Sequence, residues 1–297
     1  MTRQFPSHNG KAAMPVTPVL DSTISYRESG TGVPIVFLHG NPTSSYLWRR
    51  VLPAVGPGRL LAPDLIGMGD SGKPAIEYTF DDHARYLDAW FDALGLDDAV
   101  LVGHDWGGAL AFDRAARHPG RVRGIAFTES IVKPMTWQEF PEGGRELFRA
   151  IKTPGVGEAM ADTFVDVLPD TVAHPLSEED LAVYRRPYPT RGSRLPLLRW
   201  ARMMPLGGQP ADVVARVERY DEWLASSADV PKLLLTFEPG PGTMLGPQLI
   251  AWCAANMAAL DVVEHRLVAG HHAPEDQPEA IAETLDAWLD RHGLRRP

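Results

Sequence analysis

Short apolar runs alternate with amphipathic stretches along the first part of the chain. The run at residues 33–38 is continuous and stops at His39 and Gly40, which is typical of a strand buried on both faces. Four runs of this kind predict strands at residues 33–38, 59–65, 99–103 and 123–128. Apolar side chains at helical spacing predict two helices between them, at residues 82–94 and 106–118. This order predicts a parallel sheet with helices on both faces.

The alternation breaks after Ile131. Residues 132–214 are helix-like and rich in proline and aromatic residues. We interpret them as an inserted helical cap with an apolar underside, and the alternative is an ordinary helical subdomain packed on the core. The α/β pattern then resumes, with predicted strands at 232–237 and 262–268 and a final helix at 278–292. The sequence therefore predicts a flexible tail (1–14), one core (15–131 and 215–297) and a cap (132–214).

Composition narrows the class of protein. The 297 residues include 29 Lys+Arg and 38 Asp+Glu, a net charge of −9, which disfavours nucleic acid or an anionic membrane as a partner. The longest apolar runs are strand-sized, far short of about 18 residues, so we expect no membrane span. No apolar signal-peptide region is recognised near the start, and we expect a cytoplasmic protein. The single cysteine, Cys253, excludes an internal disulfide and is interpreted as a small buried residue.

The strongest chemical signal is the stretch Gly-His-Asp-Trp-Gly-Gly at 103–108, which follows a predicted strand and opens a predicted helix. This is the G-x-nucleophile-x-G turn, with Asp105 where esterases carry serine. Gly103 and Gly107 leave room for the sharp turn. A carboxylate attacks a saturated carbon that bears a leaving group, and water must then cleave the resulting ester. This chemistry suits carbon–halogen bonds or epoxides, whereas the competing interpretation is an Asp that merely caps a helix.

Two neutral donors are expected beside the Asp105 carboxylate. Asn41 lies in the loop after the first core strand and carries side-chain N–H groups, and Trp106 carries an indole N–H that cannot accept. Such a pair suits a departing halide, and the backbone N–H groups of the same residues suit an oxyanion hole. Alone, Asn41 would be read as a turn residue and Trp106 as a core aromatic.

The base and the acid are expected on loops that follow other strands. His271 or His272 should activate the hydrolytic water. Glu129 and Glu238 each end a predicted strand, and either could orient the histidine. The glycine-rich stretch 64–72 lacks the lysine of a phosphate-binding loop and is interpreted as a structural turn. We find no metal-ligand spacing and no dinucleotide fingerprint, so we expect no metal and no cofactor.

After about Val16 the chain resembles the haloalkane dehalogenases of the α/β-hydrolase fold. It is similar to the subfamily with an Asp–His–Glu triad and an Asn–Trp halide pair, which includes the hexachlorocyclohexane dehalogenase. The likeness is carried by residues 39–48, 64–72, 103–110, 126–130, 137–148, 205–214 and 238–240. It implies a mostly parallel central sheet flanked by helices, with an inserted helical cap. It also implies hydrolysis of haloalkanes to a primary or secondary alcohol and halide, through an alkyl ester on Asp105.

By position, the resemblance implies the nucleophile Asp105, the base His271, the acid Glu129, the halide donors Asn41 and Trp106, and the apolar pocket residues Phe148, Phe164 and Pro205. His271 rather than His272 fits the family's His-x-x-x-Glu-Asp-x-Pro spacing. Pro274 stands where the family usually has Gln, and the loop after Glu238 is unusual, which bears on tunnel shape and substrate preference. The implied partners are a small halogenated hydrocarbon, water and halide, with the protein a monomer or a weak homo-oligomer.

Several other functions share parts of this pattern. An epoxide hydrolase uses the same Asp nucleophile and needs acidic hydroxyls, for which Tyr184 and Tyr188 are available, but it leaves Asn41 without a role. A haloacetate dehalogenase wants an Arg where Trp106 stands. Coelenterazine luciferases share the scaffold. A non-catalytic ligand receptor on the same fold would be favoured by a degraded triad, and here every triad position is filled.

Overall fold

A twisted eight-stranded sheet organises the protein. The computed structural model describes residues 14–160 and 164–296. The strands are β1 (Val16–Val19), β2 (Ser22–Ser29), β3 (Pro34–Leu38), β4 (Arg59–Pro63), β5 (Ala99–His104), β6 (Val122–Thr128), β7 (Lys232–Pro239) and β8 (Leu260–Ala269). Their order is β1-β2-β4-β3-β5-β6-β7-β8. Only the β1–β2 and β2–β4 pairs are antiparallel, which confirms the prediction of a mostly parallel sheet.

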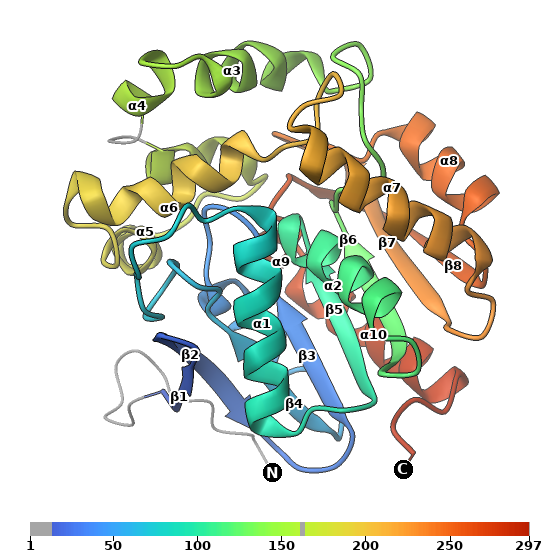
Figure 1. Cartoon of the computed structure of the whole chain (residues 1–297). Coiled ribbons are helices and arrows are strands. Elements are labelled where there is room, and N and C mark those ends of the chain that lie inside the picture. The colour runs from blue at the N-terminus through green and yellow to red at the C-terminus, as the bar shows by residue number, and fades with distance from the viewer. Residues whose placement is uncertain (1–13, 161–163, 297) are drawn as a thin grey trace.

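Helices cover both faces of this sheet (Figure 1). One face packs on α1 (Phe80–Leu94), α2 (Trp106–Arg117), α7 (Ala211–Ser226) and α8 (Pro247–Asn256), and the other on η1 (Ser45–Trp48), α9 (Ala273–Asp276) and α10 (Pro278–Arg291). Alternate residues of one strand divide between the two apolar cores: Val36 packs with the first set of helices and Phe37 with the second. The continuous apolar run in the sequence is therefore explained by burial on both faces.

The structure adds elements that the apolar pattern did not predict. Strands β1 and β2 and helix α8 were not expected; β2 is half polar in sequence and only partly buried, so it lacks the continuous apolar run of a central strand. Helix α1 begins at Phe80 rather than at residue 82, because Thr79 and Asp82 form a capping box around its first turn. Cys253 is a buried free thiol on α8, as predicted.

Residues between β6 and α7 form the helices that we predicted as a cap. They are α3 (Glu142–Lys152), α4 (Val156–Met160), η2 (Phe164–Thr171), α5 (Glu178–Arg185) and α6 (Arg191–Arg202), and Figure 1 shows α3, α4, α5 and α6 gathered at one end of the molecule. Helix α7 spans the proposed boundary at residue 214 and packs against α2 of the core. The expected flexible tail lies outside the described residues except for Met14. Over the described part of the chain, no helix combines the length and the apolar character needed to cross a bilayer.

Candidate active site

Asp105 lies in the sharp turn between β5 and α2. Its backbone has φ 53° and ψ −124°, a region that residues with a Cβ rarely adopt and that surrounding packing must impose. The neighbouring glycines permit that packing. A Cβ on Gly103 would lie 2.4 Å from the Cα of Gly108, and one on Gly107 would lie 2.1 Å from the carbonyl oxygen of Leu38. The prediction that these glycines make room for the turn is confirmed.

Two backbone N–H groups hold the Asp105 carboxylate. The Asn41 N–H donates to Oδ2 at 2.9 Å, and the Trp106 N–H also donates to the carboxylate. Gly40 lets the Asn41 loop come this close, because a Cβ there would lie 2.3 Å from Oδ2. Burial raises the pKa of Asp105, and the charge of His271 and the two N–H groups oppose that shift. The two N–H groups expected to form an oxyanion hole therefore both donate to the carboxylate of Asp105.

His271 stands between two carboxylates. Its Nδ1 lies 3.1 Å from Oε2 of Glu129, and its Nε2 lies 3.9 Å from Oδ1 of Asp105. The first distance is a hydrogen bond and the second is too long for one, so Nε2 remains available beside the carboxylate. Burial alone would lower the pKa of His271, but the hydrogen bond to Glu129 and the charges of Asp105 and Glu129 outweigh it and raise that pKa.

Glu129 is held by the backbone of a distant loop. The N–H of Met244 donates to its Oε2 at 2.6 Å and the N–H of Leu245 to its Oε1 at 3.2 Å. Glu238, the other candidate acid, is exposed near the end of β7. The structure therefore brings Glu129, and not Glu238, against His271. The Met244 and Leu245 donors were missed from the sequence, because a backbone N–H carries no residue-type signal.

His272 points to different partners from its neighbour. Its Nδ1 lies 2.7 Å from the hydroxyl oxygen of Thr171. Burial, with the nearby His271 and His104, holds the pKa of His272 well below its usual range, so this ring stays neutral. Spacing within the sequence had favoured His271 as the base, and only His271 reaches both Glu129 and Asp105.

The expected halide donors sit under the cap. The side-chain Nδ2 of Asn41 donates to the carbonyl oxygen of Leu197 on α6 at 2.9 Å, which leaves its second N–H for a ligand. The Trp106 indole is buried beside Phe80 and Trp200, with ring centroids 5.9 and 5.7 Å away. The Leu197 carbonyl thus fixes the orientation of the Asn41 amide, a role that its residue type could not indicate.

The expected pocket residues lie in the cap, but their contacts do not test that role. Phe148 on α3 packs edge-on against Phe140, and Pro205 is buried just after α6. Phe164 begins η2, and its side chain lies outside the described residues. Their place in a substrate pocket stays a prediction.

The two tyrosines that an epoxide hydrolase would need are engaged elsewhere. The hydroxyl of Tyr184 donates to Glu275, and burial raises its pKa well above the usual range. The hydroxyl of Tyr188 accepts from the N–H of Gly69 at 3.4 Å, and burial raises its pKa as well. Both residues are buried. Neither hydroxyl group makes a contact with Asp105 that would favour epoxide opening.

Three histidines have the spacing that could hold a metal ion. Ring nitrogens of His104, His271 and His272 lie within 4.8 Å of one another. Each ring already bonds to a protein group: His104 Nε2 lies 2.7 Å from the His271 carbonyl oxygen, while the other two reach Glu129 and Thr171. We interpret the cluster as hydrogen-bonded packing that fixes the His271 ring.

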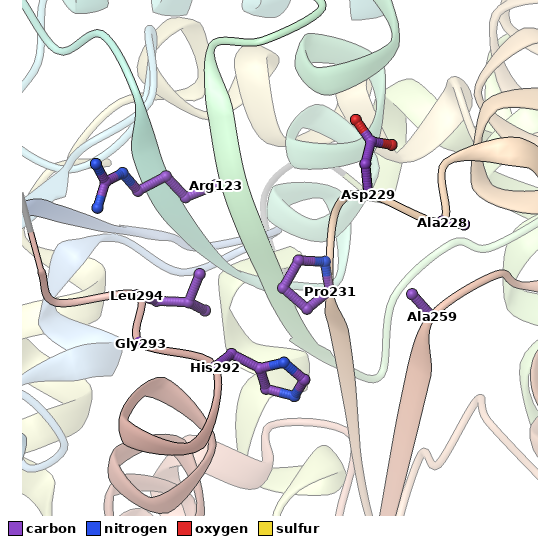
Figure 2. Close-up of a pocket in the computed structure, with 8 residues that line it drawn as sticks. All are labelled: Arg123, Ala228, Asp229, Pro231, Ala259, His292, Gly293 and Leu294. Carbon is purple, nitrogen blue, oxygen red and sulfur yellow. The ribbon is translucent and has the colours of Figure 1, made fainter.

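Two further features, a glycine-rich stretch of the sequence and a hollow in the surface, lie outside the group formed by Asp105, Glu129 and His271. The glycine-rich stretch 64–72 is a structural turn, as predicted, because Asp64 accepts from the N–H groups of Ser45 and Asp70 at 2.7 and 2.8 Å. A surface hollow of about 490 Å³ is lined by residues that include Arg123, Pro231 and Ala259 (Figure 2). These residues lie at the amino ends of β6, β7 and β8, whereas Asp105 and Glu129 follow carboxyl ends, so the hollow is at the opposite edge of the sheet.

Known proteins share both the sequence and the fold. Residues 33–179 match the α/β-hydrolase fold family. A haloalkane dehalogenase of Mesorhizobium japonicum is 47% identical over 92% of this chain and 89% of its own length. One of Bradyrhizobium diazoefficiens is 45% identical over 92% of both chains. The crystal structure of a haloalkane dehalogenase from Bradyrhizobium elkani has a TM-score of 0.89 and 46% identity, covering 95% of this chain and 98% of that one.

The sheet topology, the sharp turn at Asp105 and the sequence similarity together define this chain as an α/β hydrolase. Within that fold it belongs to the haloalkane dehalogenases, which are hydrolases that act on carbon–halide bonds.

Proposed function

We propose that this protein hydrolyses uncharged haloalkanes to an alcohol and a halide ion, with Asp105 as the nucleophile. The observation that carries the proposal is the placement of one carboxylate. Oδ2 of Asp105 accepts from the Asn41 N–H, while Oδ1 faces Nε2 of His271 at 3.9 Å. One oxygen is thus held where charge can be stabilised, and the other is left to react.

In the first step, Oδ1 of Asp105 attacks the carbon that bears the halogen. The new C–O bond forms as the carbon–halogen bond breaks, and the halide leaves with the bonding electron pair. The free N–H of the Asn41 amide and the indole N–H of Trp106 stabilise the departing charge. No proton is transferred in this step, so His271 is not required.

In the second step, Nε2 of His271 removes a proton from water, which attacks the ester carbonyl carbon, Cγ of Asp105. Negative charge builds on Oδ2, where the N–H groups of Asn41 and Trp106 stabilise it. The bond from Cγ to Oδ1 then breaks, and the alcohol leaves with the proton from His271. Glu129 orients the imidazole and stabilises its protonated form, because its carboxylate contacts Nδ1.

We propose an apolar pocket wall that includes Phe148 and Pro205; Phe164 is assigned to it by the resemblance alone, since its side chain lies outside the described residues. Such a wall favours a hydrophobic halogenated substrate over one that carries a carboxylate. Halide release from a panel of brominated and chlorinated alkanes, with an epoxide included, tests this function. We expect halide from the alkanes and no diol from the epoxide; diol without halide would overturn the proposal.

Loss of a halide donor should slow the first step. We expect Asn41→Ala and Trp106→Leu each to reduce bromide release from 1-bromobutane by about 10²-fold or more, since each removes a donor aimed at charge that develops in the transition state. Steady-state bromide assays measure the effect. Full activity in Asn41→Ala would remove the basis for a halide site at this position.

The two candidate acids provide a matched comparison. We expect Glu129→Gln to fold and bind halide but to lose turnover by about 10³-fold, because a neutral amide cannot stabilise the protonated imidazole. Glu238→Gln should keep most activity, because Glu238 is exposed at the end of β7. Bromide release and thermal unfolding are measured for both variants. An active Glu129→Gln beside a folded but inactive Glu238→Gln would move the acid to β7.

A further inference from the structure

Asp276 holds together two segments that come from different parts of the fold. Its buried side chain accepts hydrogen bonds from three backbone N–H groups. On the core side, Gly270, which directly precedes His271, donates to Oδ2 at 2.8 Å. On the cap side, Ala173 donates at 2.9 Å and His174 at 2.8 Å. The two segments thus meet at a single carboxylate.

Backbone hydrogen bonds, which involve no charged side chain, also hold the loop at 270–272. The N–H of His272 donates to the carbonyl oxygen of Thr171 at 3.1 Å, and the N–H of His271 donates to that of Pro241 at 2.9 Å. A Cβ on Gly270 would lie 2.3 Å from the Thr171 carbonyl oxygen, so the two backbones are in close contact. Residues 171–174 comprise the last residue of η2 and the three that follow it, and they lie directly against the loop at 270–272.

We propose that Asp276 is a positioning residue for the hydrolytic step, which fixes Nε2 of His271 relative to Asp105 by fastening the loop at 270–272 to the cap segment 171–174. This inference rests on the proposed function. Asp276 does not touch the reacting atoms. It acts through the Gly270 N–H, one residue before His271. Its buried carboxylate accepts from three N–H groups, and displacing it would leave a buried charge without these partners.

The neighbouring Glu275 makes a different kind of contact. Its side chain is buried and pairs with the guanidinium groups of Arg49 and Arg50, at 2.6 and 2.7 Å, and it accepts from the Tyr184 hydroxyl. Glu275 therefore joins side chains of the helix η1 region and α5. Of these two carboxylates, only that of Asp276 accepts from the backbone beside His271. We therefore assign the positioning role to Asp276.

The two chemical steps distinguish positioning from general stability. Alkylation of Asp105 needs no base, whereas ester hydrolysis needs His271 in place. We expect Asp276→Asn to slow hydrolysis by about 10²-fold, the effect of a displacement near 1 Å on a positioned group, with much less change in alkylation. The alkyl-enzyme should then accumulate. Rapid-mixing halide release measures the first step, and intact mass in the steady state measures the adduct.

A matched control is Asp113→Asn, which also removes a buried carboxylate. Asp113 lies on α2 and pairs with Arg117 and Arg216, at 2.7 and 2.8 Å, remote from the histidine loop. We expect it to lower the unfolding temperature without accumulation of adduct. Ala173→Pro deletes one N–H donor from the cap side and should cause a weaker accumulation of the adduct. This variant tests the proposal if Asp276→Asn does not fold.

The outcomes separate the two proposals. Adduct accumulation in Asp276→Asn or Ala173→Pro, absent from Asp113→Asn, supports the positioning role. If the wild-type enzyme is active but both steps are slowed equally in the Asp276 and Ala173 variants, the positioning role is wrong and the proposed function still stands. A wild-type enzyme that forms neither adduct nor halide overturns the proposed function, and the positioning role with it.

Discussion

Replacing Asp105 by alanine should abolish halide release. The N–H groups of Asn41 and Trp106 hold this carboxylate in the position from which we propose that it attacks, and water cannot substitute for it because a bimolecular displacement lacks its fixed position. We expect a loss of about 10⁴-fold or more, in line with removal of a nucleophile from other hydrolases. Steady-state bromide release from 1-bromobutane measures the loss.

The same variant should keep its fold and its halide site. Alanine does not relieve the positive φ of 53° at this position, so we expect a folded protein with a modest change in unfolding temperature. Bromide should still quench the fluorescence of Trp106, since both proposed halide donors remain. Turnover close to that of the wild-type enzyme, in a preparation free of wild-type enzyme, would contradict the role of Asp105.

Replacing His271 by phenylalanine should trap the reaction after its first half. Asp105 can still be alkylated, but Nε2 is gone, and the ester can no longer be cleaved efficiently. We expect turnover to fall by about 10³-fold or more while the alkyl-enzyme accumulates. Intact mass after incubation with 1-bromobutane, followed by peptide mapping, should place the added alkyl group on Asp105.

His272→Phe is the control for this prediction. It removes an adjacent, equally buried imidazole that contacts Thr171 rather than Asp105, so it should continue to turn over and should not accumulate adduct. If His272→Phe trapped the ester and His271→Phe turned over, the base would be His272 and the assignment by spacing would be wrong.

The central strands could be predicted from the sequence because they are buried on both faces. Strands β3 and β5 leave continuous apolar runs, and the turn at Asp105 leaves glycines whose Cβ would clash with the backbone. Strands β1 and β2 form one edge of the sheet and are partly polar, so the same pattern is absent there. The central strands and the turn at Asp105 could therefore be predicted because burial and close backbone contacts restrict the residues that fit there.

The candidate site also contains residues that the sequence indicates and contacts that it does not. Asp105 and His271 could be proposed from the sequence because the chemistry proposed for them requires particular side chains near recognisable turns. The choice between Glu129 and Glu238 could not be made from strand ends alone, because it depends on where the Met244 loop and the His271 loop meet in space. The Leu197 carbonyl that orients Asn41 is a backbone group, so no pattern of residue types could predict this contact.

A single turnover in water enriched in ¹⁸O tests the central claim, a covalent ester on Asp105, most directly. With enzyme in excess over 1-bromobutane, attack of water on the ester carbonyl predicts that the heavy oxygen enters the Asp105 carboxylate and that the alcohol carries ordinary oxygen from the protein. Mass analysis of the Asp105 peptide and of the alcohol reads out both. Heavy oxygen in the first alcohol formed, with none in Asp105, would mean direct displacement by water and would contradict the account.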